Sequence, residues 1–583
     1  MTTTIRRLGI CLLFCVCLIG NAALAAEYYL DGEKGDDAQT GTSPEAAWRS
    51  LDKLNQAALQ PGDTVFFKTG GLWYGSIKPR SGAEGKPVTY TAYGDAALGK
   101  PRIYGSSPLH RKAADWEKAG DDLWQTRADN VTRLPRKPPF IKGPASLHHE
   151  GNAVLTWKDA ALTIESSGDR TNFIQWIFAP FPIEAGKCYE FTLTFKNNAP
   201  EALSADRFRL MAAKAPYNTY GKTVGSAREG SVVRMRFQAD RTADDARLTL
   251  FLGGDRSLDR TTLAFARPPE WSEVTIDSLG LSVDVGNLIF DGEKAGWKRW
   301  SREELKNQGD FYYDPDRQCV VLRSAKPPTE QYKTIEAALK RHIVDMTGTS
   351  WCVFDGLDLR YGAAHGFGGT RTAHYVIRDC DLSWIGGALQ HFRDDGRPVR
   401  YGNAIEFWSS ARDHLVESNR IWEIYDAALT NQGSGKNEQR DIVYRNNEIW
   451  NSEYSFEYWN RDAESVTDGI LFEGNVCRDA GFGWGHVQRP DRNGRHLMFY
   501  HNTAKTSGVR IVRNTFSGTT HSMLRIENQW NEPPGTAAAR TPGPIKGLAF
   551  EGNVFQPDGD KPFAFWLFKN YTQDEFFKAV AAE

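Results

Sequence analysis

The chain has 583 residues, and its 71 lysines and arginines nearly balance its 73 aspartates and glutamates, which leaves a formal net charge of -2. This length exceeds what one ordinary hydrophobic core holds, so several domains, or one elongated repeat domain with an insertion, are expected. The balanced charge provides no basic field for nucleic acid and no polybasic anchor for anionic lipid, so neither partner is predicted. The 54 glycines, 18 tryptophans and 21 tyrosines are typical of a turn-rich β protein that presents aromatic faces.

Residues 1–26 have the features of a cleavable signal peptide. Arg6 and Arg7 form a charged start, residues 8–19 are apolar, and residues 23–25 provide a small-residue cleavage site. The apolar run is too short to span a bilayer as a helix, and no later stretch is long enough. A secreted or periplasmic protein without a membrane span is therefore expected.

Five cysteines follow this segment, and they are scattered without a C-x-x-C pair. They are Cys188, Cys319, Cys352, Cys380 and Cys477. Neither a disulfide framework nor a zinc knuckle is expected from this pattern, so at least one buried free thiol is predicted. The sequence predicts no cofactor and no metal site.

Residues 27–140 alternate apolar positions with Gly and Pro, which predicts a short helix at 51–59 that caps a series of strands. Three segments here are distinctive: YYLDGEKGDDAQTGTSPEAAWRSL, PGDTVFFKTGGLW and GKPVTYTAYG. They resemble the N-terminal cap of bacterial right-handed β-helix proteins of the pectate-lyase-like superfamily. The resemblance implies that 27–140 form the cap and first rungs of a parallel β-helix.

Residues 141–285 have a different texture, with strongly alternating runs such as 187–195, 232–237 and 248–252 separated by turn residues. This pattern predicts an antiparallel β-sandwich. The order of its strands resembles a jelly-roll carbohydrate-binding module, and a sugar-binding and a purely structural role both stay open. A strand pattern resumes at 285–290, so the sandwich is predicted to be an insertion in one rung.

Residues 286–583 contain an internal repeat from position 351 onward, in which similar strand segments recur. Leu357 and Cys380 occupy equivalent positions 23 residues apart, which suits one three-strand rung. An asparagine recurs in one column, at Asn419, Asn447, Asn475, Asn514 and Asn553. Such amides can hydrogen-bond along a parallel stack, so an interior ladder is predicted. The fold class expected is all-β, a right-handed parallel β-helix with an inserted antiparallel β-sandwich.

Successive strands of this repeat place chemically active residues in one column. Parallel strands stack about 4.8 Å apart, so outward side chains of neighbouring rungs line a common groove. The residues predicted to point outward on one face are Glu406, Thr430, Glu457, His486 and Arg525. His365 belongs to the preceding rung, and Asp426 precedes Thr430 near the start of its strand.

Carboxylates in such a column favour glycoside hydrolysis, which needs one acid to protonate the leaving oxygen and a second carboxylate as nucleophile or base. Glu406, Asp426 and Glu457 are the candidate catalytic residues. Glu406 pairs with Asp426 across one rung or with Glu457 across two, and the sequence leaves both pairs open. The segments GNAIEFW, IWEIYDAALTNQ and SFEYWN resemble a set shared by secreted bacterial β-helix proteins associated with glycosidases.

Polar and aromatic residues around the acids are the candidates for substrate binding. They are His365, Asp395, Arg400, Trp408, Asn431, Trp459, His486 and Arg525. A charged insertion at 387–400 directly precedes Glu406 and is expected to form one wall of the site. A second insertion at 488–508 is expected to form the opposite wall.

Two other functions remain open from the sequence. A polysaccharide lyase or uronate epimerase would use a base beside the sugar C5, with Arg, Lys or Ca²⁺ to neutralise the uronate. The acidic column argues against this function, and Ca²⁺ is a cofactor that only this alternative would bring. A non-catalytic carbohydrate-binding surface protein is the other. The sequence favours a monomeric glycoside hydrolase acting on a poly- or oligosaccharide.

Overall fold

The computed structural model describes residues 25–581 with internal gaps, so positions 1–24 of the predicted signal peptide lie outside the described residues. The gaps are 128–129, 134–143, 151–153, 159–160, 166–172, 179, 198–202, 204–206, 253–260, 278, 501, 528–531 and 533–534. The described chain is all-β, with a few short helices. No helix among these residues is long and apolar enough to cross a membrane.

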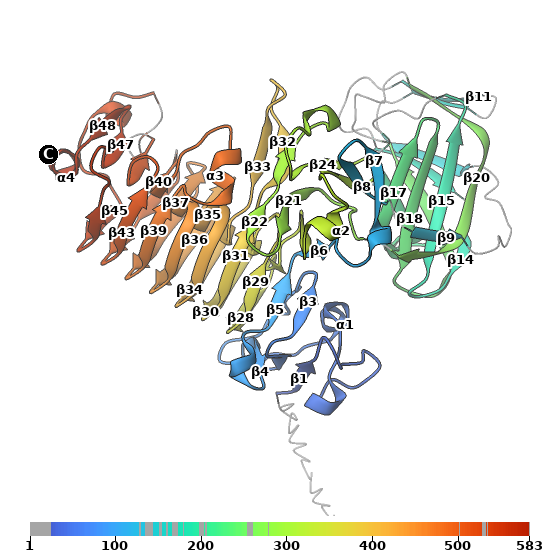
Figure 1. The fold of residues 1–583 in the computed structure, drawn as a ribbon, viewed down its shortest axis with the longest axis horizontal. Helices are drawn as coiled ribbons and strands as arrows, with labels where there is room; N and C mark the ends of the chain where they lie inside the picture. Colours follow the sequence, from blue (N-terminus) through green and yellow to red (C-terminus); the bar gives the residue numbers. More distant parts are fainter. Residues whose placement is uncertain are drawn as a thin grey trace, which may run out of the picture.

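The largest sheet has 25 strands, and most of its neighbouring strands pair in parallel, as the stack of arrows in Figure 1 shows. A series of strands that pair one after another along the stack is called here a file. The first file consists of β28 (Ser350–Asp355), β30 (Phe367–Arg378), β34 (Ile405–Glu417), β36 (Glu438–Arg445), β38 (Val466–Glu473), β42 (Val509–Val512) and β45 (Leu548–Glu551). A second consists of β29 (Asp358–Arg360), β31 (Asp381–Ile385), β35 (Arg420–Ser434), β37 (Glu448–Arg461), β39 (Val476–Ala480), β43 (Thr515–Thr519) and β46 (Val554–Gln556). The third file, which carries the candidate site, joins the first part of β34 to the later parts of β35 and β37, then to β40 (Arg495–Phe499), β44 (Leu524–Ile526) and β47 (Ala564–Trp566).

Apolar residues at matching positions of successive strands build the core of this stack. Phe354, Ile377, Val416 and Tyr444 are directly opposite one another in consecutive strands and are fully buried. Because side chains alternate between the two faces of a strand, this register also fixes which residues point outward. The packing therefore holds the outward column of the third file in place.

The predicted asparagine ladder is confirmed. The side-chain amide of each member donates to the side-chain oxygen of the next, from Asn419 to Asn447 (2.9 Å), Asn475 (2.9 Å), Asn514 (3.0 Å) and Asn553 (2.9 Å). The same oxygens accept the backbone N–H of the preceding member. The ladder satisfies buried polar groups along one corner of the stack.

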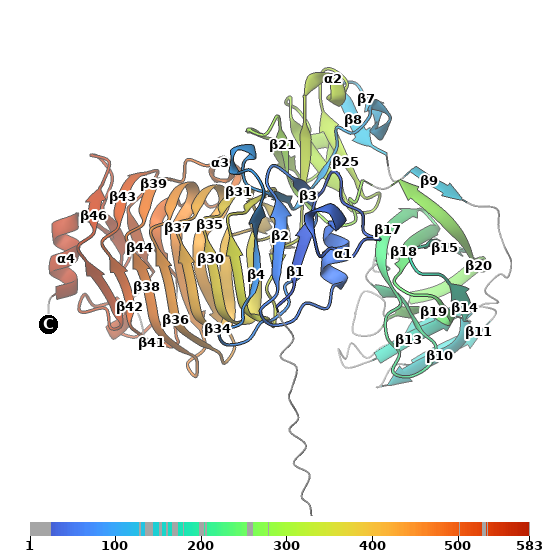
Figure 2. The ribbon, with the colours of Figure 1, turned by 90° about the horizontal axis from the view of Figure 1, so that it is seen from below.

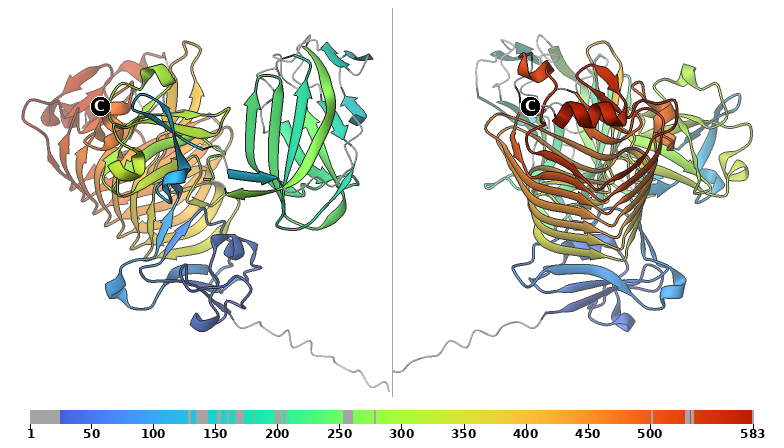
Figure 3. Two further views of the ribbon diagram at one scale, coloured as in Figure 1. Left: turned by 45° about the vertical axis from the view of Figure 1, so that its right-hand side comes forward. Right: turned by 90° about the vertical axis from the view of Figure 1, so that its left-hand side faces the viewer.

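The two ends of the stack are covered by different segments (Figure 3). At one end, β1 (Glu27–Leu30), β2 (Thr64–Lys68) and β4 (Val88–Tyr93) pair in parallel and continue onto β28. The predicted helix at 51–59 is α1 (Leu51–Gln56), whose first turn is capped by the Ser50 hydroxyl. At the other end lies α4 (Gln573–Ala581).

Residues between β9 (Asn130–Arg133) and β20 (Thr261–Asp277) form two antiparallel sheets, called here the two-sheet region. The sheets share a core that includes Phe191, Leu193, Met235 and Leu248. This pairing agrees with the alternating sequence pattern, and β9 adds a strand before position 141. Figure 2 shows the region beside the end of the stack that holds β1 and β2. The domain boundaries remain predictions.

A group of short strands lies between the two-sheet region and the stack. It includes β21 (Val285–Phe290), β23 (Trp297–Arg299), β24 (Asp310–Asp314) and β25 (Cys319–Arg323). The insertion at 387–400 forms a hairpin of β32 (Ala388–Phe392) and β33 (Pro398–Tyr401). The base of this hairpin needs glycine, because a Cβ at Gly402 (φ 140°) would lie 2.1 Å from the Cα atom of Gly386.

Candidate active site

The third file places Glu406, Thr430 and Glu457 directly opposite one another on consecutive strands, with Arg525 two strands further on. The residue between Glu457 and Arg525 is Met498, so the predicted place of His486 in the column is wrong. His486 lies instead in the short helix α3 (Trp484–Gln488), which leaves the stack before β40 resumes it. The chain between β39 and β40 is an insertion, and sequence periodicity does not determine its length.

A cavity of about 790 Å³ opens over this column. All three candidate acids line it, and so do four of the predicted binding residues: His365, Arg400, Trp408 and Trp459. The hairpin residues Gln390, His391, Arg393 and 398–401 form one wall. Residues 489–491 form part of another wall, and they belong to the insertion for which this position was predicted.

The other predicted binding residues do not line the cavity. Asn431 is fully buried on the inner face of β35, where its side-chain oxygen accepts a hydrogen bond from the Tyr444 hydroxyl (2.7 Å). Asp395 lies exposed beyond the end of β32 and pairs with Arg397 (2.7 Å). Arg525 lies 3.4 Å from Glu527 and stacks over Phe565.

Arg400 lines the cavity, but neighbouring acceptors use its guanidinium. Nε donates to the Gly387 carbonyl (2.7 Å), Nη1 to Gln488 Oε1 (3.0 Å) and Nη2 to the Gly286 carbonyl (2.8 Å). This buried side chain therefore joins the hairpin to α3 and β21.

Glu406 is buried at the floor of the cavity, and its two oxygens have different neighbours. Oε2 accepts a hydrogen bond from the Asn403 amide (2.7 Å), and Oε1 lies 3.2 Å from His365 Nε2. Burial raises the pKa of the Glu406 carboxyl to about 7, although the Asn403 hydrogen bond opposes this shift and the charge of Asp426 adds to it. Glu406 can therefore hold or release a proton near neutral pH.

The backbone orients the His365 ring. The Asn403 N–H donates to His365 Nδ1 (3.0 Å), so the proton of the neutral ring is on Nε2, which faces Glu406. Burial, and then the nearby His342, lower the pKa of His365 well below its ordinary value, which keeps the ring neutral. The His342 ring stacks on it at 5.0 Å between centroids.

Asp426 lies in the middle of β35, and a buried arginine holds it. Arg489 Nη1 donates to Asp426 Oδ1 (3.0 Å) and to the Tyr425 carbonyl (3.2 Å). Burial raises the pKa of Asp426, but the Arg489 charge opposes this shift. Arg489 Nε lies 3.8 Å from the buried carboxylate of Glu453, which His486 Nδ1 also contacts at 2.9 Å.

Glu457 accepts a hydrogen bond from Gln432 (2.9 Å) and has no ion-pair partner among the described residues. Burial raises the pKa of Glu457 well above its ordinary value, and the charges of Asp426 and Glu406 raise it further. The three carboxyl groups therefore influence one another electrostatically. Asp426, with its cation, is the one that we expect to lose its proton first.

Aromatic side chains line the cavity beside the acids. Trp408 and Trp459 follow Glu406 and Glu457 by two residues on their strands, so both point outward on the same face. Their rings meet edge to face at 5.4 Å, and Arg461 stacks on Trp459 at 4.6 Å. The described residues contain no group of three or more His, Cys, Asp or Glu that could hold a metal ion.

No protein-family model matches the chain. A lacto-N-biosidase from Bifidobacterium longum is 42% identical over 96 residues, which are 16% of this chain and 6% of that protein. Alpha-1,3-galactosidase A from Akkermansia muciniphila is 26% identical over 149 residues, which are 24% of this chain and 23% of that protein. The chain therefore spans less than a quarter of the length of these curated relatives.

Among solved structures, a complex of XylC with xylose aligns with a TM-score of 0.41 and 11% identity over 91% of this chain and 68% of that chain. A lacto-N-biosidase from Eubacterium ramulus aligns with a TM-score of 0.26 and 10% identity over the same shares.

Proposed function

We propose that the chain is a secreted glycoside hydrolase whose body is a right-handed parallel β-helix and whose acid pair is Glu406 and Asp426. The observation that carries the proposal is one cavity with three carboxyl groups, two buried and one partly buried, in different electrostatic surroundings. Two titratable groups whose environments separate their pKa values can divide the roles of acid and base. The names of the two curated relatives, both glycosidases, support the same class of reaction.

In this proposal Glu406 donates a proton to the leaving glycosidic oxygen. Its pKa of about 7 suits that role at neutral pH, and Asn403 and His365 hold its two oxygens in place. Asp426, whose negative charge Arg489 stabilises, acts on the anomeric carbon directly or through a water molecule. Glu457 is the alternative partner, two strands from Glu406, at a Cα separation of about 9–10 Å from strand spacing.

The substrate proposed is a neutral oligosaccharide. Trp408 and Trp459 present flat apolar rings on which sugar C–H faces can stack. The acids would repel a uronate, and Arg489, which lines the cavity with them, is already paired with Asp426. Lacto-N-biosyl and α-1,3-galactosyl glycosides are the first substrates to try, because the names of the curated relatives specify them.

The test is a parallel assay of the purified chain on these neutral glycosides and on uronate polysaccharides. We expect new reducing ends from a neutral glycoside and no ultraviolet absorbance from unsaturated sugars. Unsaturated products from a uronate would replace the proposal with a lyase. Binding without any cleavage would replace it with a carbohydrate-binding protein.

A further inference from the structure

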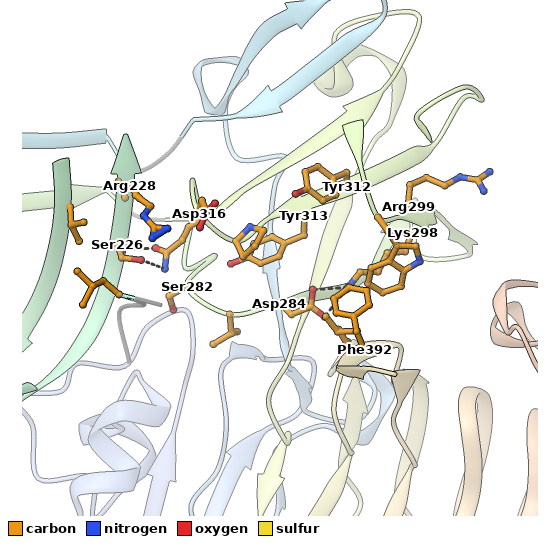
Figure 4. A pocket seen from close by; sticks show the side chains of 18 residues that line it. Ser226, Arg228, Ser282, Asp284, Lys298, Arg299, Tyr312, Tyr313, Asp316 and Phe392 are labelled. Atoms are coloured by element: carbon orange, nitrogen blue, oxygen red, sulfur yellow. Dashed lines mark hydrogen bonds and ion pairs between the residues drawn. The ribbon is translucent and has the colours of Figure 1, made fainter. Parts of the chain in front are cut away.

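A second cavity, of about 580 Å³, lies between the two-sheet region and the hairpin of β32 and β33 (Figure 4). Its volume is within the range of about 300–1,000 Å³ that is usual for small-molecule sites. Side chains from β17 (Gly221–Glu229), β23, β24 and β32 line it. Ser226 of β17 and Gln318 exchange two hydrogen bonds, of 2.7 and 3.0 Å, which fix one side of the cavity.

Exposed apolar side chains gather at this cavity. Phe392 is 51% exposed and Val283 is 38% exposed, although both line the same hollow. Trp300 meets Phe392 edge to face, with ring centroids 5.6 Å apart. Apolar side chains that cluster and stay accessible to water in this way are typical of binding sites.

The charges around the cavity nearly cancel. Lys298 Nζ bonds to both oxygens of Asp284, at 2.5 and 2.7 Å, and the lysine is buried. Arg299 is paired with Asp310 (3.1 Å), and Arg228 and Asp316 also line the cavity. Because charges of one sign do not dominate, the cavity suits a neutral ligand with hydroxyl groups better than an anion.

The second cavity shares a wall with the candidate active site. Leu389 and Phe392 of β32 line the second cavity, whereas Gln390 and His391, between them in the chain, line the first. Asp284 also accepts a hydrogen bond from the Leu389 N–H (2.7 Å), which connects this wall to the Lys298–Asp284 ion pair. A ligand in the second cavity would therefore contact the back of the active-site wall.

We propose that this cavity is a second, non-catalytic site for a neutral saccharide, which stacks on Trp300 and Phe392. The class of ligand rests on the proposed function, whereas the existence of the site does not depend on which carboxylate acts. Such a site would hold part of a glycan next to the hairpin while another part occupies the active-site cavity.

The test is a calorimetric titration of the full chain, carrying Glu406→Gln to prevent turnover, with lacto-N-biose and separately with galactose. We expect two binding sites for at least one probe. Adding Trp300→Ala should weaken one site at least about tenfold, because the ring supplies the main stacking surface. Adding Trp408→Ala should weaken the other.

Trp297→Ala is the matched control, because this exposed tryptophan is near Trp300 in the chain but does not line the cavity. It should leave both sites intact. If Trp300→Ala does not fold, Phe392→Ala makes the same test with a half-exposed residue. A single site that Trp408→Ala removes and these variants leave unchanged would overturn the inference. So would a lack of binding of either probe outside the active-site cavity.

The cleavage assay separates this inference from the proposed function. Hydrolysis of a neutral glycoside with no second site would end only the inference. A second site in a chain that cleaves no glycoside would end only the proposed function.

Discussion

The asparagine ladder and the carboxylate cavity are two ways of burying polar side chains on the same stack of strands. In the ladder, each amide both donates and accepts, so identical residues satisfy one another from Asn419 to Asn553. In the cavity, ionised carboxylates only accept, so neighbours such as Glu406 and Glu457 repel one another instead of bonding. Repetition of one residue type is stabilising in the first region and costly in the second.

This cost is seen in the shifted pKa values of the acids that line the cavity. Burial and like charges raise the pKa values of Glu406 and Glu457, whereas Arg489 limits the rise at Asp426. A fold that only needed stability would place amides or apolar groups here. The difference between the two regions therefore separates a structural use of buried polar groups from a functional one.

The largest effect is expected when a carboxyl group of the cavity is replaced by an amide, the group that forms the ladder. Glu406→Gln keeps the side-chain volume and replaces an ionisable group with a donor and acceptor. Turnover of an identified glycoside should fall by about 10²–10⁴-fold, as is usual when a general acid is removed. Rate measurements beside a thermal melt would show that the loss is chemical, because the fold should survive.

The matched control for this loss is Glu417→Gln on the same strand. Glu417 pairs with Arg445 (2.7 Å) away from the cavity, so its loss removes only a surface ion pair. Turnover should stay at the wild-type level. Full activity in Glu406→Gln would show that the acid has been assigned to the wrong residue.

A smaller effect is expected when an amide of the ladder is replaced by an apolar side chain. Asn447→Leu removes the acceptor of the Asn419 N–H and the donor to the Val416 carbonyl. Each buried group left without a partner costs about 1–3 kcal/mol, so the free energy of unfolding should fall. Chemical denaturation measures it, with Asn570→Leu, an exposed site in β48 (Lys569–Tyr571), as the control. Equal stability of the two variants would contradict the structural role of the ladder.

Strand periodicity predicted the regions where the repeat is regular. In β34, β35, β37 and β44, the residue that follows the inward-pointing position was correctly predicted to belong to one column. The strand register determines the place of each of these residues. The same alternation places Asn431, which follows the outward Thr430, on the inner face. The prediction of Asn431 as a substrate-binding residue was therefore a mistake that the sequence pattern could have corrected.

Insertions between strands could not be placed in this way. Periodicity does not constrain the length or path of 481–494, so a helical His486 was mistaken for a strand residue. For the same reason the sequence did not identify Arg489 as the partner of Asp426. The contacts of Arg489 with Asp426 and of Asn403 with His365 join residues that are far apart in the chain, so only the structure brings them together.

The smallest effect concerns stability as a function of pH, and it tests the cavity without an assay substrate. Glu406 has a folded-state pKa of about 7, above the ordinary value of 4.5, so the folded chain retains a proton that the unfolded chain releases. Wild type should therefore lose stability relative to Glu406→Gln as pH rises from about 4.5 to 7, by about 1.4 kcal/mol per pH unit at most. Above pH 7 the difference should stay constant.

Glu551→Gln is the control. Arg510 lowers the pKa of Glu551, so the contribution of Glu551 to stability changes only below about pH 4.5. In thermal melts from pH 5 to 8, the stability of Glu551→Gln should therefore run parallel to that of wild type. Parallel curves for wild type and Glu406→Gln would mean that Glu406 is ionised throughout and cannot be the proton donor.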